Sequence, residues 1–179
     1  MIRILCQILR TGIVSEEIPH DAGSRIEERG EGLDEAIGKH FRRSLTIRMV
    51  DAGSCNGCEL EIQALTNAFY NCEQYGIHFT ASPRFADMLL VTGPVTRNME
   101  TALRRTYNAM PPPKLVVAVG DCGCNGGIFG TSYASLGGVD RVLPVDVAIH
   151  GCPPAPADIL RGIMQAVEKK REKKRETGE

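Results

Sequence analysis

The segment Leu115–Val119 reads LVVAV, follows three prolines at 111–113 and leads into GDCGCNGG at 120–127; it decides the fold class. Consecutive apolar residues between a proline breaker and a glycine are typical of a strand buried on both faces of a parallel sheet. A second apolar run, Val145–Ile149, is followed closely by glycine and Cys152. Both runs predict a buried strand whose carboxyl end leads into a glycine-containing loop with a cysteine.

Strand and helix patterns alternate over the rest of the chain from Ser44. The predicted strands cover Leu45–Val50, Ile77–Thr80 and Asp87–Thr92, and the predicted helices cover about Asn56–Tyr70, Thr96–Asn108 and the stretch from Pro156 onward. Proline is tolerated in the first turn of a helix, which suits the start of the last one. This alternation predicts an α/β domain with a mostly parallel sheet.

Composition divides the chain into three predicted segments. Residues 1–43 are rich in charge and glycine and contain Pro19, so we expect an N-terminal arm that binds a partner or stays mobile. Residues 44–168 are the predicted α/β domain. Residues 169–179 are a charged C-terminal tail, which we interpret as a solvated helix end, with contact to a membrane surface or partner as the alternative.

The composition of the whole chain limits the classes of function. Of its 179 residues 42% are hydrophobic, which is enough for one core. The net charge of -1 gives no basic field, and 5% aromatic residues without tryptophan give no stacking surface, so nucleic acid is not an expected partner. The start of the chain does not resemble a signal peptide, and no stretch approaches the roughly 20 apolar residues of a transmembrane helix. We therefore expect a cytoplasmic protein.

Seven cysteines in such a chain indicate thiols that are kept reduced for metal or redox chemistry. Four of them follow predicted strands: Cys55, Cys58, Cys122 and Cys152. Because the carboxyl ends of parallel strands meet at one edge, where open α/β sheets bind ligands, we expect these four to share one crevice. Glycines beside each of them allow the backbone to approach a bulky group and to direct N–H groups at sulfur.

Four thiolates can hold either a cubane iron–sulfur cluster or a structural zinc ion. Zinc ribbons usually carry two close pairs about 15 to 20 residues apart, in chains too small to fold without metal. Here a sizeable core and an isolated last cysteine favour the cluster, while zinc and a thiol-redox CxxC stay open as alternatives. Cys122 is preferred over Cys124 because it lies nearest the strand end, and Cys72 and Cys6 are interpreted as small apolar residues.

A nucleotide site is not predicted. The glycine-rich stretch 120–127 and the Gly93-Pro94 pair both lack the GxxxxGK[ST] pattern of a phosphate loop. Neither shows GxGxxG followed by an acidic ribose ligand within a βαβ unit. We therefore expect no nucleotide cofactor.

Four motifs cover most of the chain from Val50 to Val167: DAGSCNGCELEI at 51–62, SPRFADMLLVTGPVTRNM at 82–99, VAVGDCGCNGGIF at 117–129 and GVDRVLPVDVAIHGCPPAP at 138–156. With these motifs the chain resembles the small subunit of nickel–iron hydrogenases. The resemblance is strongest to the short form found in membrane-bound formate hydrogenlyase and energy-converting hydrogenase complexes. The cluster-bearing 20 kDa subunit of respiratory complex I shares the same fold.

The resemblance implies one 4Fe-4S cluster held by Cys55, Cys58, Cys122 and Cys152, proximal to a nickel–iron centre in a separate large subunit. Electrons would pass between that centre and a ferredoxin-like iron–sulfur subunit. The CNGC motif is typical of hydrogenases. Complex I subunits instead begin this ligand set with two adjacent cysteines. A twin-arginine leader and a further cluster domain are missing, which fits a complex held on the cytoplasmic side of the membrane by membrane subunits. Cys124 stands where relatives more often have a residue without a thiol.

Three polar residues near the predicted cluster are secondary candidates. Glu59 lies at a helix start, where a carboxylate is favoured by the helix dipole. In the hydrogenases that the chain resembles, a glutamate in this place lies on a proposed proton route. His150 could donate a hydrogen bond to a cluster sulfur and Arg97 could lie at an interface, with an ordinary solvated side chain as the alternative for each.

The sequence therefore predicts an α/β, flavodoxin-like domain that relays electrons within a hydrogenase-type oxidoreductase whose catalytic metal lies in its partner. The first alternative is a complex I-like relay whose electrons reach a quinone. An alternative from another class is a zinc-bound structural module.

Overall fold

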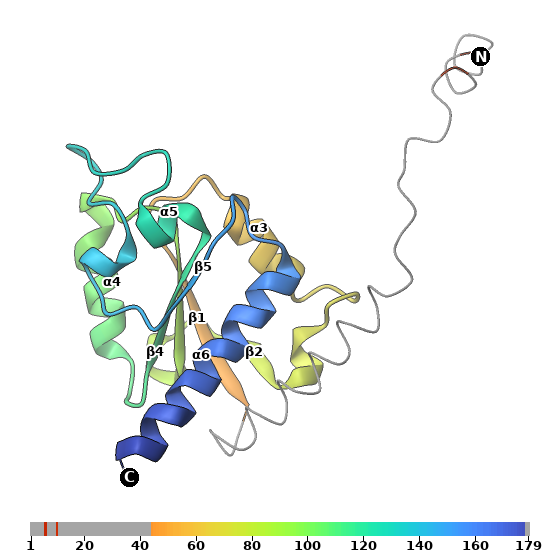
Figure 1. The fold of residues 1–179 in the computed structure, drawn as a ribbon, viewed down its shortest axis with the longest axis vertical. Coiled ribbons are helices and arrows are strands. Elements are labelled where there is room, and N and C mark those ends of the chain that lie inside the picture. The colour runs from red at the N-terminus through yellow and green to blue at the C-terminus, as the bar shows by residue number, and fades with distance from the viewer. Residues whose placement is uncertain (1–5, 7–9, 11–43, 178–179) are drawn as a thin grey trace.

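The structure of the protein is a computed structural model that describes Cys6, Arg10 and residues 44–177. The predicted arm at 1–43 lies outside the described residues, apart from those two positions. Residues 44–177 form a central sheet with helices packed on both faces (Figure 1). Among the helices described, none is both long enough and apolar enough to cross a membrane.

The sheet has five strands, and every pair of neighbours is parallel. The strands are β1 (Leu45–Asp51), β2 (Ile77–Phe79), β3 (Met88–Thr92), β4 (Leu115–Val119) and β5 (Val147–Ile149), in the order β2-β1-β3-β4-β5. This is the strand order of flavodoxin-like, doubly wound α/β proteins. The predicted fold class is confirmed, and β4 has the bounds that the sequence predicts.

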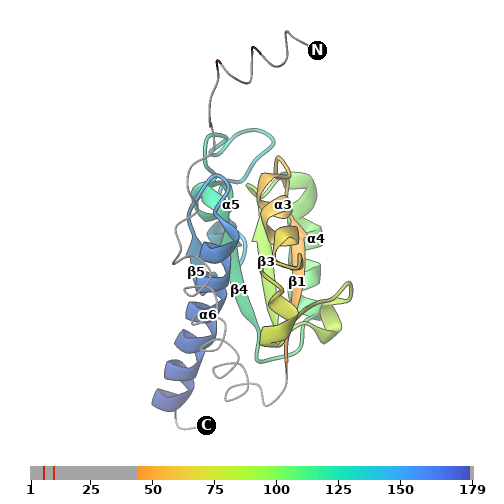
Figure 2. The same ribbon diagram turned by 90° about the vertical axis from the view of Figure 1, so that its right-hand side faces the viewer.

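Helices on both faces bury the apolar runs of the sheet. Helices α3 (Gly57–Ala64) and α6 (Pro156–Thr177) contribute to one apolar cluster, and α4 (Arg97–Ala109) contributes to the cluster on the other face. Every residue of the central strands β3 and β4 is buried, which is why their sequences show no alternation of polar and apolar residues. A short helix, α5 (Gly120–Asn125), follows β4, and α3 and α5 lie at the same end of the sheet (Figure 2).

Three single-turn 3-10 helices complete the described elements. They are η1 (Cys72–Tyr75), η2 (Pro83–Phe85) and η3 (Val139–Arg141). Each lies in a connection between larger elements, so none changes the order of the sheet.

Helix α3 is shorter than predicted, because it ends at Ala64 and not near Tyr70. The side-chain oxygen of Asn67 accepts hydrogen bonds from the backbone N–H groups of Phe69 and Tyr70, at 2.9 and 3.0 Å. Such bonds compete with the helical pattern and favour a turn. The chain then folds back, and the N–H of Cys72 donates to the carbonyl of Leu65 at 2.9 Å.

Strand β5 begins at Val147, two residues later than predicted. Its entry is held by Asp146, whose carboxylate accepts a hydrogen bond from the N–H of Val116 at 2.8 Å, while its own N–H donates to the Val116 carbonyl at 2.8 Å. The carboxylate of Asp146 thus accepts the hydrogen bond that a backbone carbonyl would accept if the pairing of β4 and β5 began one residue earlier.

Replacement of Leu90 tests the central strand. Leu90 is fully buried in β3, so Leu90→Ala should lower the free energy of unfolding by about 3 kcal/mol through lost burial and the cavity that remains. The matched control is Leu60→Ala, because Leu60 is 57% exposed on α3 and its truncation should cost less than about 0.5 kcal/mol. Anaerobic urea denaturation measures both, and equal losses in the two variants would contradict the assignment of β3 to the core.

Candidate metal centre

The four cysteines predicted to act together lie at the carboxyl edge of the sheet. Cys55 precedes α3 and Cys58 lies in its first turn, Cys122 lies in α5, and Cys152 follows β5. The elements that carry them follow β1, β4 and β5, which end side by side with β3 between β1 and β4. The structure therefore brings together cysteines that are far apart in the sequence, as the parallel sheet predicts.

The thiols are close enough to affect one another's ionisation. Burial raises the pKa of Cys58 to about 12, with further contributions from the negative charge of Glu59 and of the thiolates of Cys55, Cys122 and Cys152. Burial is also the largest cause that raises the pKa of Cys122, and the negative charges of Cys152 and Cys55 raise it further. Because thiolates crowded in this way repel one another, a cationic metal group would stabilise them and would release protons on binding.

Two glycines leave space beside the sulfurs. A Cβ atom added to Gly120, whose φ is +81°, would lie 2.5 Å from the sulfur of Cys58. A Cβ atom added to Gly127, whose φ is +52°, would lie 2.8 Å from the sulfur of Cys122. Both positions exclude a side chain by backbone conformation and by contact, so the glycines form a cradle around the thiols.

Asp121 and Gly151 fasten two of the cysteine segments to each other. The N–H of Asp121 donates to the carbonyl of Gly151 at 2.9 Å, and the N–H of Gly151 donates to Oδ1 of Asp121 at 3.0 Å. Nδ1 of His150 lies 3.4 Å from the same carboxylate oxygen. The spacing of Cys122 and Cys152 thus depends on a reciprocal pair of hydrogen bonds, and the ring nitrogen Nδ1 of His150 is directed at Asp121.

A network of short polar contacts sets the start of α3. Oδ1 of Asp51 accepts hydrogen bonds from the N–H groups of Gly53 and Ser54, each at 2.7 Å. The hydroxyl of Ser54 accepts from the N–H of Asn56 at 3.0 Å and donates to Oε1 of Glu59 at 2.6 Å. Glu59 is only 4% exposed, and its Oε2 is buried without a hydrogen-bond partner among the described residues.

Cys124 points away from the other thiols. Its sulfur lies 3.5 Å from the carbonyl of Ile149, to which it donates a weak hydrogen bond beneath the ends of β4 and β5. Burial raises its pKa to about 11, and the charges that act on it are those of Asp121 and Asp140 rather than of other cysteines. Cys72 is buried in the core, whereas Cys6 is exposed.

The sequence did not reveal an exposed apolar loop beside Cys122. Ile128 and Tyr133 are 92% and 93% exposed, and Phe129 is also exposed. Arg97, for which the sequence leaves open both an interface role and an ordinary solvated side chain, holds this loop. Its Nε donates to the carbonyl of Tyr133 at 2.8 Å, and its N–H donates to the carbonyl of Ala134 at 2.9 Å. The only sequence signal was the apolar pair that directly follows the two glycines at 126–127.

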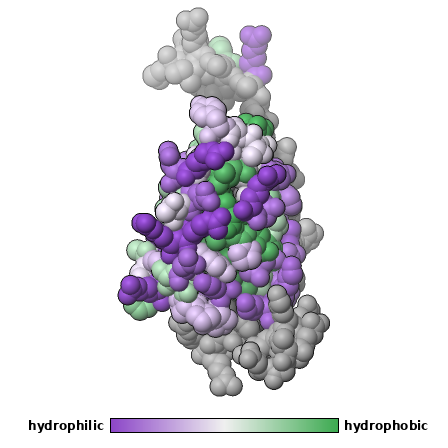
Figure 3. All heavy atoms as spheres, turned by 90° about the vertical axis from the view of Figure 1, so that its left-hand side faces the viewer, coloured by the Kyte–Doolittle hydropathy of each residue, from purple (hydrophilic) through white to green (hydrophobic). Residues whose placement is uncertain are grey.

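Apolar surface is also visible on the side of the molecule that carries α4. Figure 3 shows a band of hydrophobic residues on this side, with hydrophilic residues along its borders. Among the described residues, no group of three or more His, Cys, Asp and Glu side chains lies close enough together to hold a single metal ion.

Comparison with known proteins relates the chain to subunits of redox complexes. It is 42% identical over 142 residues to formate hydrogenlyase subunit 7 of Escherichia coli. This match covers 79% of this chain and 56% of that subunit. It is 43% identical over 145 residues to a probable membrane-bound hydrogenase subunit of Pyrococcus furiosus, with 81% and 84% of the two chains covered.

Among solved structures, the archaeal membrane-bound sulfane sulfur reductase, a respiratory membrane complex, contains a chain that superimposes with a TM-score of 0.59. The two chains are 36% identical, and the match covers 79% of this chain and 75% of the other. The profile of the family described as "NADH ubiquinone oxidoreductase, 20 Kd subunit" matches residues 55–166. The resemblance drawn from the sequence is confirmed, and the chain belongs to this family of hydrogenase small subunits and complex I 20 kDa subunits.

Proposed function

We propose that this chain holds one 4Fe-4S cluster on Cys55, Cys58, Cys122 and Cys152 and relays electrons within a membrane-associated nickel–iron hydrogenase complex. The observation that carries the proposal is the meeting of these four thiols, which come from three separate segments, at one edge of the sheet. Family membership makes the chain a subunit of an oxidoreductase of the hydrogenase or complex I type.

The space that two glycines leave beside the thiols supports a bulky cluster over a single zinc ion. A tetrahedral zinc ion needs its sulfurs about 3.8 Å apart, because each Zn–S bond is about 2.3 Å long. A cubane cluster holds its ligand sulfurs farther apart, because irons and sulfides lie between them. The described thiols lie within electrostatic reach of one another, and the cradle of Gly120 and Gly127 leaves space beside them for a group larger than one ion.

The residues around the thiols would hold and tune the bound group. When bound, a 4Fe-4S cluster supplies one-electron redox chemistry. The partial burial of Cys58 limits the access of water, and the pair of hydrogen bonds between Asp121 and Gly151 fixes the separation of two ligand segments. The negative charge of Asp121 beside Cys122 would favour the oxidised state and so lower the potential.

The exposed loop supports a partner that covers the site. Ile128, Phe129 and Tyr133 project from an ordered loop next to Cys122, and apolar residues of this size on a surface mark a protein interface. The related subunits belong to formate hydrogenlyase and membrane-bound hydrogenase, so the proposed partners are a nickel–iron large subunit, a ferredoxin-like subunit and membrane subunits. The chain would then lie peripherally on the cytoplasmic side of the membrane.

A complex I-like relay to a quinone is the second candidate. It is favoured by relatives that are named as subunits of NADH-quinone oxidoreductase, one of them, from a Geobacter species, 42% identical over 150 residues. The CNGC motif at 55–58 favours the hydrogenase type. Metal analysis of the anaerobically purified complex separates the candidates: about four irons per chain after subtraction of partner clusters, with nickel, supports the hydrogenase, whereas iron without nickel supports the quinone relay. Stoichiometric zinc in a colourless protein would overturn both.

Single cysteine replacements test the ligand set. Cys55→Ala, Cys58→Ala, Cys122→Ala and Cys152→Ala should each abolish cluster assembly, because each removes one ligand. Cys124→Ala is the matched control and should keep the full iron content and visible absorption, because this thiol points to Ile149. Bleaching by Cys124→Ala together with retention of colour in Cys122→Ala would show that the ligand assignment is wrong.

Replacement of Gly120 tests the cradle. Gly120→Ala places a methyl group 2.5 Å from the sulfur of Cys58 and should lower the iron content several-fold after anaerobic reconstitution. Gly130→Ala is the control, because its φ of +51° imposes a similar backbone strain while nothing lies within 4 Å of the added Cβ. If both variants bind the same amount of iron, the Gly120 contact does not matter.

Glu59→Gln tests the proposed proton route. Glu59 is buried beside Cys58 and is paired through one oxygen with Ser54, so the isosteric amide should preserve the fold and the cluster spectrum. Turnover of the assembled complex should fall by about tenfold or more if this carboxylate carries protons. Glu61→Gln is the control on the same helix. Unchanged turnover with Glu59→Gln would leave Glu59 with a structural role at the helix start.

A further inference from the structure

Strand β1 has an open outer edge. It pairs with β3 over Ile47–Asp51 but with β2 only over Leu45–Ile47. The last hydrogen bond to the β2 side runs from the N–H of Thr80 to the carbonyl of Ile47, at 2.9 Å. Beyond this point no described strand pairs with the outer edge of β1.

Met49 is the first residue of β1 beyond the end of β2 whose backbone faces this edge. In a parallel ladder alternate residues direct their N–H and C=O groups to opposite sides of the strand. Because the Ile47 carbonyl faces β2, the N–H and C=O of Met49 face the same side, where β2 has ended. An edge of this kind is a template for another strand, and native proteins usually cover it.

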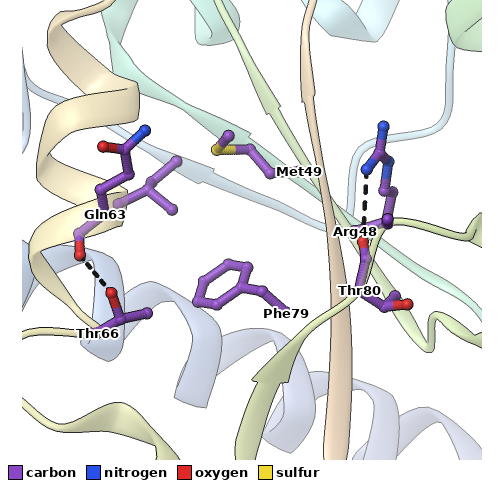
Figure 4. Close-up of a pocket in the computed structure, with 8 residues that line it drawn as sticks. Arg48, Met49, Gln63, Thr66, Phe79 and Thr80 are labelled. Atoms are coloured by element: carbon purple, nitrogen blue, oxygen red, sulfur yellow. Dashed lines mark hydrogen bonds between the residues drawn. The ribbon is translucent and has the colours of Figure 1, made fainter.

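A cavity of about 370 Å³ lies on the open edge, lined by Arg48, Met49, Ile62, Gln63, Thr66, Phe79, Thr80 and Ala81. Figure 4 shows Met49 and Phe79 on one side of β1 and Arg48 on the other. Successive side chains of a strand point to opposite faces of the sheet, so the cavity offers an apolar wall on one face and a guanidinium on the other.

The guanidinium of Arg48 is only partly satisfied by hydrogen bonds. Its Nε is buried with no partner in the described part of the chain, and one terminal nitrogen reaches the Thr80 carbonyl only at 3.5 Å. A buried donor without a partner is costly, and a carboxylate matches the fork geometry of arginine better than any other side chain. The unpaired Nε and the long contact of the terminal nitrogen therefore favour an acidic group on this face.

We propose that the open edge of β1 binds an extended segment of a partner protein of the same complex, which adds as a short strand beside Met49. An apolar side chain of that segment packs against Met49, Ile62 and Phe79, and an adjacent acidic side chain pairs with Arg48. Neighbouring side chains of the added strand point to opposite faces of the sheet, so one can reach the apolar wall and the next can reach Arg48. A compact small molecule does not reach both faces at once. The inference rests on the proposed function only in taking the chain to be one component of an assembly.

Site-specific photocrosslinking tests this docking site. Full-length chain with p-benzoylphenylalanine at Phe79, made in cells that assemble the whole complex, should crosslink to a partner segment in which an apolar and an acidic residue are adjacent. Arg48→Gln in the same chain should lower the crosslink yield by about tenfold, because it removes the charge pair. Arg84→Gln is the control, since Arg84 is exposed on η2 and does not line the cavity. A crosslink to residues 1–43, to a second copy of this chain or to no protein would overturn the proposal.

Hydrogen exchange provides a measurement that needs no variant. In the isolated full chain the amide of Met49 should exchange faster than that of Val50, which faces β3, and in the complex it should slow by at least about tenfold. The same rate for Met49 in both samples would overturn the docking site. Iron analysis of the same complex keeps the two proposals apart: protection without iron contradicts the cluster alone, and iron without protection contradicts the docking site alone.

Discussion

The parallel hydrogen bonding of β1, β3, β4 and β5 is the constraint on which the rest of the molecule depends. It aligns the carboxyl ends of the strands, so that the segments carrying Cys55, Cys58, Cys122 and Cys152 emerge at one edge. The energy for this alignment comes from the buried strands and the helices on both faces rather than from the thiols. The cysteines are thus brought together by a core whose fully buried residues include none of them, and only afterwards does their mutual repulsion create a demand for a cation.

Local features leave room around the thiols at this edge and fix the segments that carry them. The positive φ of Gly120 turns the chain sharply after β4, and the absence of a side chain leaves room for the sulfur of Cys58. Asp121 uses both its backbone and its carboxylate to hold Gly151. These features are small, and each acts on the position of a neighbouring thiol rather than on the stability of the sheet.

Periodicity and residue type predicted the fold class and the shared location of the four thiols, because buried parallel strands have long apolar runs and their ends must meet. The remaining features depend on contacts that no local pattern records. The early end of α3 depends on the side chain of Asn67. The direction of Cys124 depends on a carbonyl in β5, and the exposure of Ile128 and Tyr133 depends on a loop held by Arg97.

The reciprocal hydrogen bonds between Asp121 and Gly151 also bear on the order of events during synthesis. A ribosome releases the two cysteines of CNGC first, then the segment after β4, and Cys152 shortly before helix α6. Domains generally fold as units, so the hydrogen bonds between Asp121 and Gly151 cannot form until β5 has joined the edge of the sheet and α6 has packed over it. A nascent chain therefore presents isolated thiols, and the four come together only after the residues up to α6 have been synthesised.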